Sequence, residues 1–368
     1  MNLSSLYISP LETCNLHCRL CYTRKHPHQL TNSQILDFVD KYQDFVTDQP
    51  NGFLRALNVA THSPRSKKCV TDQKLNSITF CGGEVFLLPG FPNLVNQLLS
   101  RKIFITIITN GTLDRLSEIS DPANCQLLVS LDGPKDIHDA NRGKGNFAKT
   151  IDFIRHSLRL GFPAEIMFLI TKSSYPHLDS LPQELQATLG LPIKFNHITY
   201  KSHSYTACHP LSQSTPGSQS LTPEQIIHIK HHYPSIPGPQ FGCSQISLQS
   251  DGQIYGCCES PTPIGQISDP ISQIVNNFSS SLSICKKCPI FTDDQSLRAQ
   301  RTSALANPKV VRSKAKSTSG GSTAKNWLPN LKCYGCCSPG FLCGYKKELQ
   351  LTTCQQVIGK FNQQEDGH

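Results

Sequence analysis

The sequence has no long apolar run and no sign of an export signal. Its longest apolar stretch, IFITII at residues 103–108, is far shorter than the ~20 residues that a membrane-spanning helix needs. The first ten residues, MNLSSLYISP, lack the basic segment followed by an apolar run that marks a secretory signal. These absences argue against membrane insertion and secretion. We therefore expect a cytoplasmic protein with no membrane partner.

Acidic residues are absent from one long part of the chain. None occurs between Gln295 and Lys347, and this part carries much of the formal net charge of +9. A basic surface can bind nucleic acid. However, residues 289–332 contain few large apolar side chains, and such a composition is typical of a solvated segment. We interpret residues 289–332 as a flexible basic insertion and expect no nucleic-acid partner.

Cysteine, in contrast, is abundant. The chain has 17 cysteines among 368 residues, and ten of them fall between Cys243 and Cys354. A small secreted protein with this composition would form disulfides. A chain of this size without an export signal, with cysteines at short spacings, favours metal sites instead. The sequence therefore predicts iron or zinc binding.

The first 200 residues alternate short apolar runs with amphipathic stretches of helical periodicity, such as residues 32–46. Six strand–helix repeats predict an α/β fold with a parallel sheet, which carries its chemistry at the C-terminal ends of the strands. The predicted strands, all within residues 6–199, are LYIS, SITFCGGE, IFITIITN, QLLVSLDG, EIMFLIT and IKFNHIT.

We divide the chain into three parts by composition. Residues 1–200 hold the predicted sheet, residues 201–240 form a bridge rich in Ser, Thr, Pro and His, and residues 241–368 form a cysteine-rich region. The bridge contains one predicted helix, for which Thr222 is the N-cap and Gln225 completes a capping box.

Three cysteines follow the first predicted strand in the stretch LETCNLHCRLCYT. Cys14, Cys18 and Cys21 have the spacing C-x3-C-x2-C. A [4Fe-4S] cube normally takes four thiolates, so three ligands leave one iron open to a substrate or cofactor. A zinc site with a distant fourth ligand is the alternative.

The three cysteines and three further motifs resemble the radical S-adenosylmethionine (SAM) superfamily over roughly residues 6–199. These motifs are FCGGE at 80–84, TNGT at 109–112 and VSLDGPKDIHDANRGKGNF at 129–147. The resemblance implies a partial (β/α)6 TIM-like barrel that binds SAM and a [4Fe-4S] cluster. It also implies SAM-binding roles for Tyr22 at the adenine, Ser130 at the ribose, Arg142 at the methionine carboxylate, and Gly82, Gly83, Glu84 and Asn110 at the ends of strands two and three.

Three other cysteines of this region, Cys69, Cys81 and Cys125, fall outside these motifs. We interpret them as ordinary small core or loop residues.

The cysteine-rich region resembles the SPASM extension of radical SAM enzymes, which holds up to two auxiliary [4Fe-4S] clusters. The resemblance implies an inner cluster held by Cys243 and Cys257 with Cys336 or Cys337. The outer cluster would then be held by Cys285, Cys288, Cys333 and Cys354. The insertion at 289–332 departs from the short spacer of that family. A structural zinc site formed by the CxxC pairs at 285/288 and 333/336 is the alternative.

The resemblance implies an oxidoreductase that reductively cleaves SAM to a 5′-deoxyadenosyl radical and abstracts hydrogen from a peptide or protein side chain. Auxiliary clusters can remove an electron, which favours oxidative modification or crosslinking. Sulfatase maturation is disfavoured because Cys258 and Glu259, rather than an Asp, follow Cys257. Both residues are candidate catalytic groups.

The expected partners are a peptide or protein substrate, an electron donor such as flavodoxin or ferredoxin, and a separate leader-binding protein, because the first strand begins too early for a fused one. Two alternative functions stay open. One is radical SAM chemistry on a small molecule in cofactor biosynthesis. The other is a non-catalytic module that binds zinc and nucleic acid.

Overall fold

A computed structural model describes residues 2–21, 27–48, 75–190, 193–199, 245–256 and 262–285, together with isolated residues between 219 and 229. The predicted insertion at 289–332 and most of the cysteine-rich region lie outside these ranges. The division of the chain into three parts therefore stays a prediction.

The described strands form one sheet in the order β6-β5-β4-β3-β2-β1-β7-β8-β9. Strands β1 to β6 are parallel, as the strand–helix alternation predicted, and β7 lies parallel to β1 on its other side. Strands β8 and β9 add an antiparallel edge. The strands are β1 (Asn2–Ile8), β2 (Ser77–Phe80), β3 (Phe104–Thr109), β4 (Cys125–Ser130), β5 (Ala164–Ile170), β6 (Lys194–Thr199), β7 (Gln245–Leu248), β8 (Gln253–Tyr255) and β9 (Pro263–Gln266).

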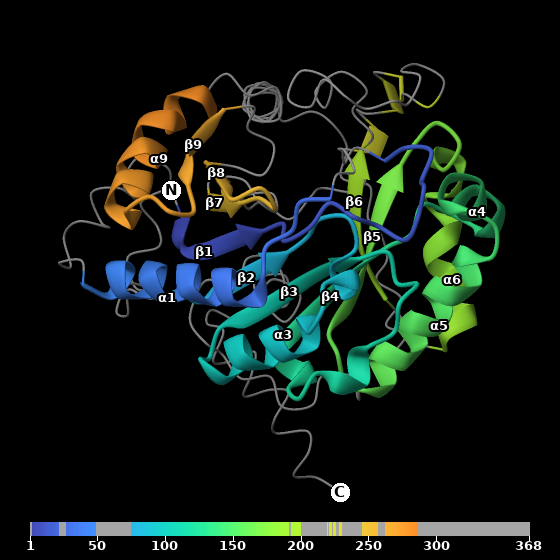
Figure 1. Cartoon of the computed structure of the whole chain (residues 1–368). Helices are drawn as coiled ribbons and strands as arrows, with labels where there is room; N and C mark the ends of the chain where they lie inside the picture. Colours follow the sequence, from blue (N-terminus) through green and yellow to red (C-terminus); the bar gives the residue numbers. More distant parts are fainter. Residues whose placement is uncertain are drawn as a thin grey trace, which may run out of the picture.

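Helices follow the strands along the outer side of the sheet (Figure 1). This arrangement agrees with the predicted α/β fold of the partial-barrel type. The helices are α1 (Asn32–Asp48), α3 (Phe91–Ser100), α4 (Lys135–Arg142), α5 (Asn146–Arg159), α6 (Ser180–Leu189) and α9 (Ile271–Cys285). Short 3-10 turns lie at Val85–Leu87, Leu116–Glu118, Pro122–Asn124 and Tyr175–His177.

Helix α1 shows how the apolar pattern produces the packing. Its buried residues are Ile35, Phe38, Val39, Tyr42 and Val46, which share one face at helical spacing. Buried Tyr42 also donates a hydrogen bond of 2.9 Å from its hydroxyl to the carbonyl oxygen of Leu3. The helix is thereby fixed to the strand that precedes the three-cysteine loop.

Two predicted boundaries differ from the structure. Strand β2 ends at Phe80, so the Gly-Gly-Glu motif belongs to a loop. The motif at 129–147, which the resemblance implies to be the fourth strand and the loop that follows it, instead continues after β4 into helices α4 and α5. They are separated because Gly143 (φ 102°) and Gly145 (φ 85°) adopt backbone conformations that residues with a Cβ rarely take.

Strand β7 extends the sheet beyond the six predicted strands. Its residue Gln245 accepts a hydrogen bond of 2.9 Å through Oε1 from the hydroxyl of Ser5 in β1. The first described part of the cysteine-rich region is therefore hydrogen-bonded to the barrel sheet itself. In the bridge, the predicted capping box is confirmed, since Thr222 N donates to Gln225 Oε1 (2.9 Å) and Gln225 N to Thr222 Oγ1 (3.3 Å).

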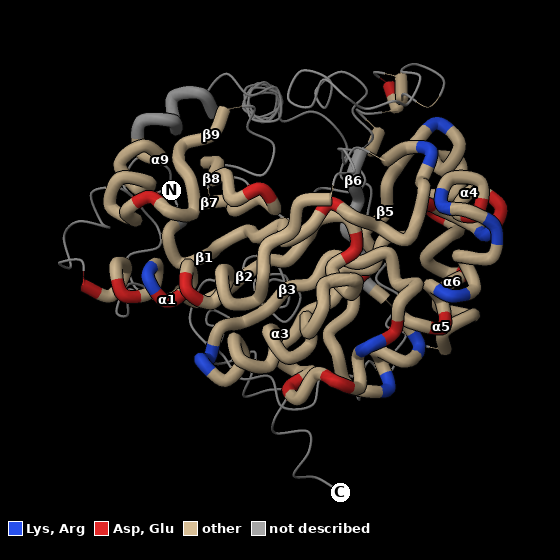
Figure 2. Tube along the Cα trace, viewed as in Figure 1, with Lys and Arg blue, Asp and Glu red and all other residues tan. Residues whose placement is uncertain are grey.

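Charged residues lie mainly on the helices and connections, whereas the central strands are largely uncharged (Figure 2). This distribution is that of a sheet buried beneath a layer of helices. In the described ranges no helix has the length and apolar character that a membrane span requires.

The Tyr42 hydrogen bond gives a stability prediction. Tyr42→Phe should lower the free energy of unfolding by ~1–2 kcal/mol, because the buried carbonyl of Leu3 loses its partner. Denaturant unfolding of the full chain measures this change. The matched variant Tyr255→Phe removes a 2.6 Å bond to Gln253 in β8, where both residues are only half-buried and water can replace it, and should cost less. Equal costs for the two variants would contradict the prediction.

Candidate active site

The three-cysteine loop directly follows β1, at the C-terminal edge of the parallel strands. Cys14, Cys18 and Cys21 are half-buried thiols that form no disulfide within the described residues. Cys21 N donates to Cys18 O at 3.2 Å, which closes a turn between the second and third cysteine. The position of this loop agrees with the prediction that chemistry lies at the strand ends.

The Gly-Gly-Glu loop after β2 packs against the backbone of the three-cysteine loop. Gly83 N donates to Leu11 O (2.9 Å) and Glu84 N donates to Thr13 O (3.0 Å). A Cβ on Gly82 would lie 2.3 Å from Leu11 O, and one on Gly83 would lie 2.1 Å from Thr13 O. The family resemblance implies that these glycines bind SAM. In the structure, the approach of the cysteine loop already requires both of them.

Glu84 joins the ends of β2 and β3. Its side chain is 1% exposed, and its carboxylate accepts hydrogen bonds from Thr109 Oγ1 (2.9 Å), Asn110 N (2.8 Å) and Phe86 N (3.3 Å). Burial raises the pKa of Glu84, and these hydrogen bonds oppose that rise. The carboxylate is thus held by protein donors and sets the relative position of the two strand ends.

Asn110, at the end of β3, contacts the first cysteine. Its Nδ2 donates to Asn15 Oδ1 at 2.9 Å and lies 3.8 Å from Cys14 Sγ, within hydrogen-bond range of sulfur. Leu16 N donates to the same sulfur at 3.4 Å. Thr112 completes the network by donating through Oγ1 to Asn110 Oδ1 (2.6 Å) and accepting from Asn15 Nδ2 (2.8 Å). Hydrogen bonds to a ligand sulfur tune an iron–sulfur cluster, so Asn110 is placed to act on Cys14.

After β4, buried Asp132 forms an ion pair with half-buried Arg142. Arg142 donates from Nε to Asp132 Oδ2 (2.7 Å) and from Nη2 to Oδ1 (2.9 Å). Burial opposes ionisation of Asp132, but the Arg142 charge outweighs it and lowers the pKa of this carboxyl. Burial raises the pKa of Cys18 to about 11, and the nearby Arg142 charge opposes that rise. Arg142 therefore favours the thiolate that a metal requires.

Asn141 connects the ion pair to the cysteine loop. Its Nδ2 donates to Asp132 Oδ2 (2.5 Å), and its Oδ1 accepts from Leu20 N (2.9 Å). Its carbonyl oxygen accepts from Arg19 N (2.9 Å). Arg19 and Leu20 lie between Cys18 and Cys21. The loop is thus bound by the segments after β2, β3 and β4 in turn.

Sequence reasoning missed Asn141, Asn15 and Glu12, because the resemblance gave no role to these positions within the quoted stretches. Glu12 lies two residues before Cys14 and accepts a hydrogen bond of 3.0 Å from Ser9 Oγ. Burial raises its pKa to about 7, opposed by the Ser9 hydrogen bond and increased further by Asp251. This acid sits beside the cysteine loop.

The remaining predicted residues are placed only in part. Ser130 is the half-buried last residue of β4, paired in register with Met167. Cys81 and Cys125 are buried, which confirms their interpretation as core residues. Cys285 is the last residue of α9, and nothing of its side chain is described. The predicted residues outside the described ranges are Tyr22, Cys69, Cys243, Cys257, Cys258, Glu259, Cys288, Cys333, Cys336, Cys337 and Cys354.

The cysteine loop fits an iron–sulfur cube. Within the described part of the chain, no three His, Cys, Asp or Glu side chains converge on a single metal ion. Each thiolate of a cube binds a different iron, so the three sulfurs need not meet at one point. Three thiols on one loop, the half-buried cation Arg142 beside them and N–H donors to Cys14 Sγ form a donor set that suits such a cluster.

Residues 8–178 match the profile of the radical SAM superfamily. Residues 8–178 thus carry a radical SAM domain. The matched segment begins at the last residue of β1 and contains all three loop cysteines, both glycines and the Asp132–Arg142 pair. SAM and a [4Fe-4S] cluster are therefore the cofactors of this radical SAM domain.

Three curated proteins resemble the chain. The sporulation killing factor maturation protein SkfB of Bacillus subtilis is 25% identical over 178 residues, which cover 46% of this chain and 37% of SkfB. The antilisterial bacteriocin subtilosin biosynthesis protein AlbA of Bacillus subtilis is 23% identical, covering 61% and 46%. The mycofactocin maturase MftC of Mycolicibacterium smegmatis is 20% identical, covering 59% and 53%. The chain thus spans about half or less of the length of these relatives.

Among solved structures, native anSMEcpe with bound AdoMet has a similar fold. It superposes with a TM-score of 0.54 at 19% identity, over 78% of this chain and 86% of anSMEcpe. A structure of the same protein with AdoMet and the Kp18Cys peptide superposes equally well, with a TM-score of 0.54 at 18% identity. At this identity the similarity concerns the fold, and it agrees with the parallel sheet of the radical SAM domain.

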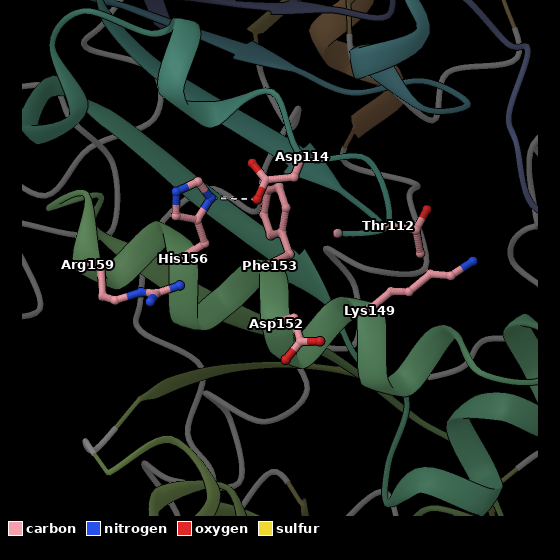
Figure 3. A pocket seen from close by; sticks show the side chains of 8 residues that line it. Thr112, Asp114, Lys149, Asp152, Phe153, His156 and Arg159 are labelled. Carbon is pink, nitrogen blue, oxygen red and sulfur yellow. Dashed lines mark hydrogen bonds and ion pairs between the residues drawn. The ribbon is translucent and has the colours of Figure 1, made fainter.

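A cavity of about 450 Å³ opens beside helix α5, and none of its lining residues belongs to the cysteine loop (Figure 3). His156 and Asp114 lie across from each other there, with His156 Nδ1 2.5 Å from Asp114 Oδ2. Charged and largely exposed side chains line most of it, including Lys149, Asp152 and Arg159. Gly111 and Thr112 of the TNGT motif also line the cavity, and Thr112 hydrogen-bonds Asn15 of the cysteine loop.

The close approach at Gly83 predicts a loss of cluster affinity. Gly83→Ala should push the backbone at Thr13 away and weaken retention of the reconstituted cluster by about tenfold or more. Iron loss to a chelator measures this. Gly190→Ala, where a Cβ meets nothing within 4 Å, is the control and should retain iron normally. Normal iron retention in Gly83→Ala would contradict the prediction.

His138, on helix α4, gives a prediction about pH. It is fully buried, and its Nδ1 accepts a hydrogen bond of 3.3 Å from Asp132 N, so the neutral ring is the form that fits. Burial lowers the pKa of His138 from 6.5 to about 4, although the Asp132 charge opposes the shift. The unfolded chain then binds a proton more readily than the folded chain between these two pH values.

Stability should therefore fall as the pH decreases from 6.5 toward 4, by at most ~1.4 kcal/mol per pH unit from this group. The variant His138→Gln cannot take up this proton. The difference in unfolding free energy between the parent protein and the variant should shrink as the pH falls through this window. Denaturant titrations at several pH values measure it, and a constant difference would contradict the assignment.

Proposed function

We propose that this chain is a radical SAM enzyme that modifies a peptide or protein side chain. The observation that carries the proposal is the convergence of three successive strand ends on the three-cysteine loop. Glu84, Asn110 and Asn141 each contact that loop directly. In a parallel sheet the C-terminal strand ends meet at one edge, which is where ligands bind.

In this proposal, Cys14, Cys18 and Cys21 hold the cluster as thiolates and leave one iron for SAM. When bound and reduced there, the cluster would supply the electron for reductive cleavage of SAM and so the radical chemistry that removes hydrogen from the substrate. The charge of Arg142 favours the thiolate form of Cys18 and Cys14. Asn110 and the amide of Leu16 donate to the Cys14 sulfur and set its orientation.

The protein also orients SAM in this proposal. Two nitrogens of Arg142 bind Asp132, which leaves its remaining Nη for the methionine carboxylate. Ser130, at the last position of β4, faces the ribose, and Tyr22 contacts the adenine. The backbone of Gly82 and Gly83 lies between the cysteine loop and β2, close to where the amino group would bind.

The names of the relatives support a peptide substrate. SkfB is a maturation protein for a killing factor, AlbA a biosynthesis protein for a bacteriocin, and MftC a maturase. A separate leader-binding protein and an electron donor such as flavodoxin or ferredoxin complete the proposed system. Chemistry on a small molecule is the second candidate, since the chain matches these relatives over only part of their length.

Oxidative modification or crosslinking requires a path for the second electron. We propose that one or two auxiliary clusters provide it, held by the cysteines between Cys243 and Cys354. Cys258 and Glu259 are the proposed groups for proton or thiol chemistry beside the inner cluster. A structural zinc site at the two CxxC pairs is the alternative, and metal analysis separates the two.

The cysteine assignment predicts that alanine at position 14, 18 or 21 abolishes SAM cleavage. After anaerobic reconstitution, each variant should hold about four fewer irons per chain than the parent protein and form 5′-deoxyadenosine only at the rate of cluster-free protein. The matched control is Cys125→Ala, a buried cysteine at the opposite end of β4, which should keep cluster and cleavage. Cleavage by a cluster-free triple variant would refute the proposal.

Substrate class is tested by co-expression with short peptides encoded beside the gene. A mass decrease of about two units, the loss of two hydrogens, is expected for an oxidative crosslink. SAM cleavage without a mass change in any peptide would favour the small-molecule candidate. Colourless protein that holds zinc and binds RNA would favour the non-catalytic module.

A further inference from the structure

Asn141 takes part in three hydrogen bonds that connect helix α4 to Asp132 and to the cysteine loop. Its side-chain nitrogen donates to Asp132 Oδ2. Its side-chain oxygen accepts from Leu20 N, and its main-chain oxygen accepts from Arg19 N. Its exposure is only 9%, so water has little access to replace these bonds. One residue thus binds two consecutive peptide N–H groups of the turn that separates Cys18 from Cys21.

The orientation of Asn141 is itself fixed. Asp132 is 2% exposed and is held on both oxygens by Arg142, so its position does not depend on Asn141. Asp132 can only accept hydrogen bonds, which obliges Asn141 to present its NH₂ group to Asp132 and its oxygen to Leu20 N. An aspartate at position 141 would place a second carboxylate against Asp132, and an aliphatic residue would leave Leu20 N without its partner.

We propose that Asn141 is a positioning residue that fixes the Cys18–Cys21 turn against helix α4 before the cluster binds. The inference rests on the proposed cluster site. A cube requires its thiolates in a fixed relative arrangement. If Asn141 orders the turn in the cluster-free protein, cluster binding does not have to supply the conformational entropy cost of ordering it. Asn141 contacts neither the sulfurs nor SAM in this scheme and acts through the backbone of the loop.

The test compares Asn141→Ala with the parent protein and with Asp136→Asn. Asp136 is on the same helix with a side chain that is 99% exposed, so its variant controls for changes in α4. The first measurement is amide hydrogen exchange of the cluster-free full chain over residues 15–21. The second is the rate at which the reconstituted protein loses iron to a chelator, with the midpoint potential of the cluster recorded alongside.

Asn141→Ala should speed exchange at the Leu20 amide by about tenfold and at the Arg19 amide by less, because the main-chain acceptor of Arg19 remains, without faster exchange in β4 or α5. Iron loss should be about tenfold faster, as for other residues that orient metal ligands. The Asp136→Asn variant should behave as the parent protein in both measurements. If Asn141→Ala does not fold, Asn141→Leu, which keeps helix propensity and similar volume, serves in its place.

Unchanged exchange at both amides, or unchanged iron loss, would overturn the inference. Faster exchange throughout the domain would also overturn it, because that pattern indicates a general loss of stability. A parent protein that never assembles a [4Fe-4S] cluster would instead refute the proposed function. The exchange measurement uses cluster-free protein and would still decide whether Asn141 holds the turn.

Discussion

The site depends on one close backbone contact, the packing of residues 11–13 against Gly82 and Gly83. Carbonyl oxygens of the cysteine loop lie where the Cβ atoms of ordinary residues would be. Only glycine allows such an approach, and the hydrogen bonds from Gly83 N and Glu84 N then fix the loop in place. The thiols of Cys14, Cys18 and Cys21 are consequently held at the edge of the sheet.

Two buried carboxylates organise the rest of the site, each in a different way. Glu84 is held by neutral donors from β3 and its own turn, whereas Asp132 is paired with the cation Arg142. A buried carboxylate is tolerated only when such partners are present. Loss of these partners would leave an unpaired buried carboxylate and destabilise the fold. The first acid connects β2 with β3, and the second connects β4 with helix α4 and, through Asn141, with the cysteine loop.

The segment that matches the superfamily is shorter than the segment that forms the sheet. The match ends at residue 178, before β6, while the sheet continues through β6 on one side and β7 to β9 on the other. Cofactor chemistry therefore belongs to the part that is shared with other radical SAM proteins. Fold similarity alone does not identify a substrate, so the groups that select one must be sought in the rest of the chain.

The sequence alone determined the six parallel strands, helix α1, the capping box of the bridge and the radical SAM class. Each of these depends on local periodicity or on motifs whose spacing is visible in the chain. The tertiary structure decided which distant residues meet. Asn15 with Thr112 and Asn141 with Leu20 are separated by about one hundred positions, and no local pattern predicts such pairs. It also decided that Gly82 and Gly83 accommodate the cysteine loop, because a steric limit between two loops exists only once both are placed in space.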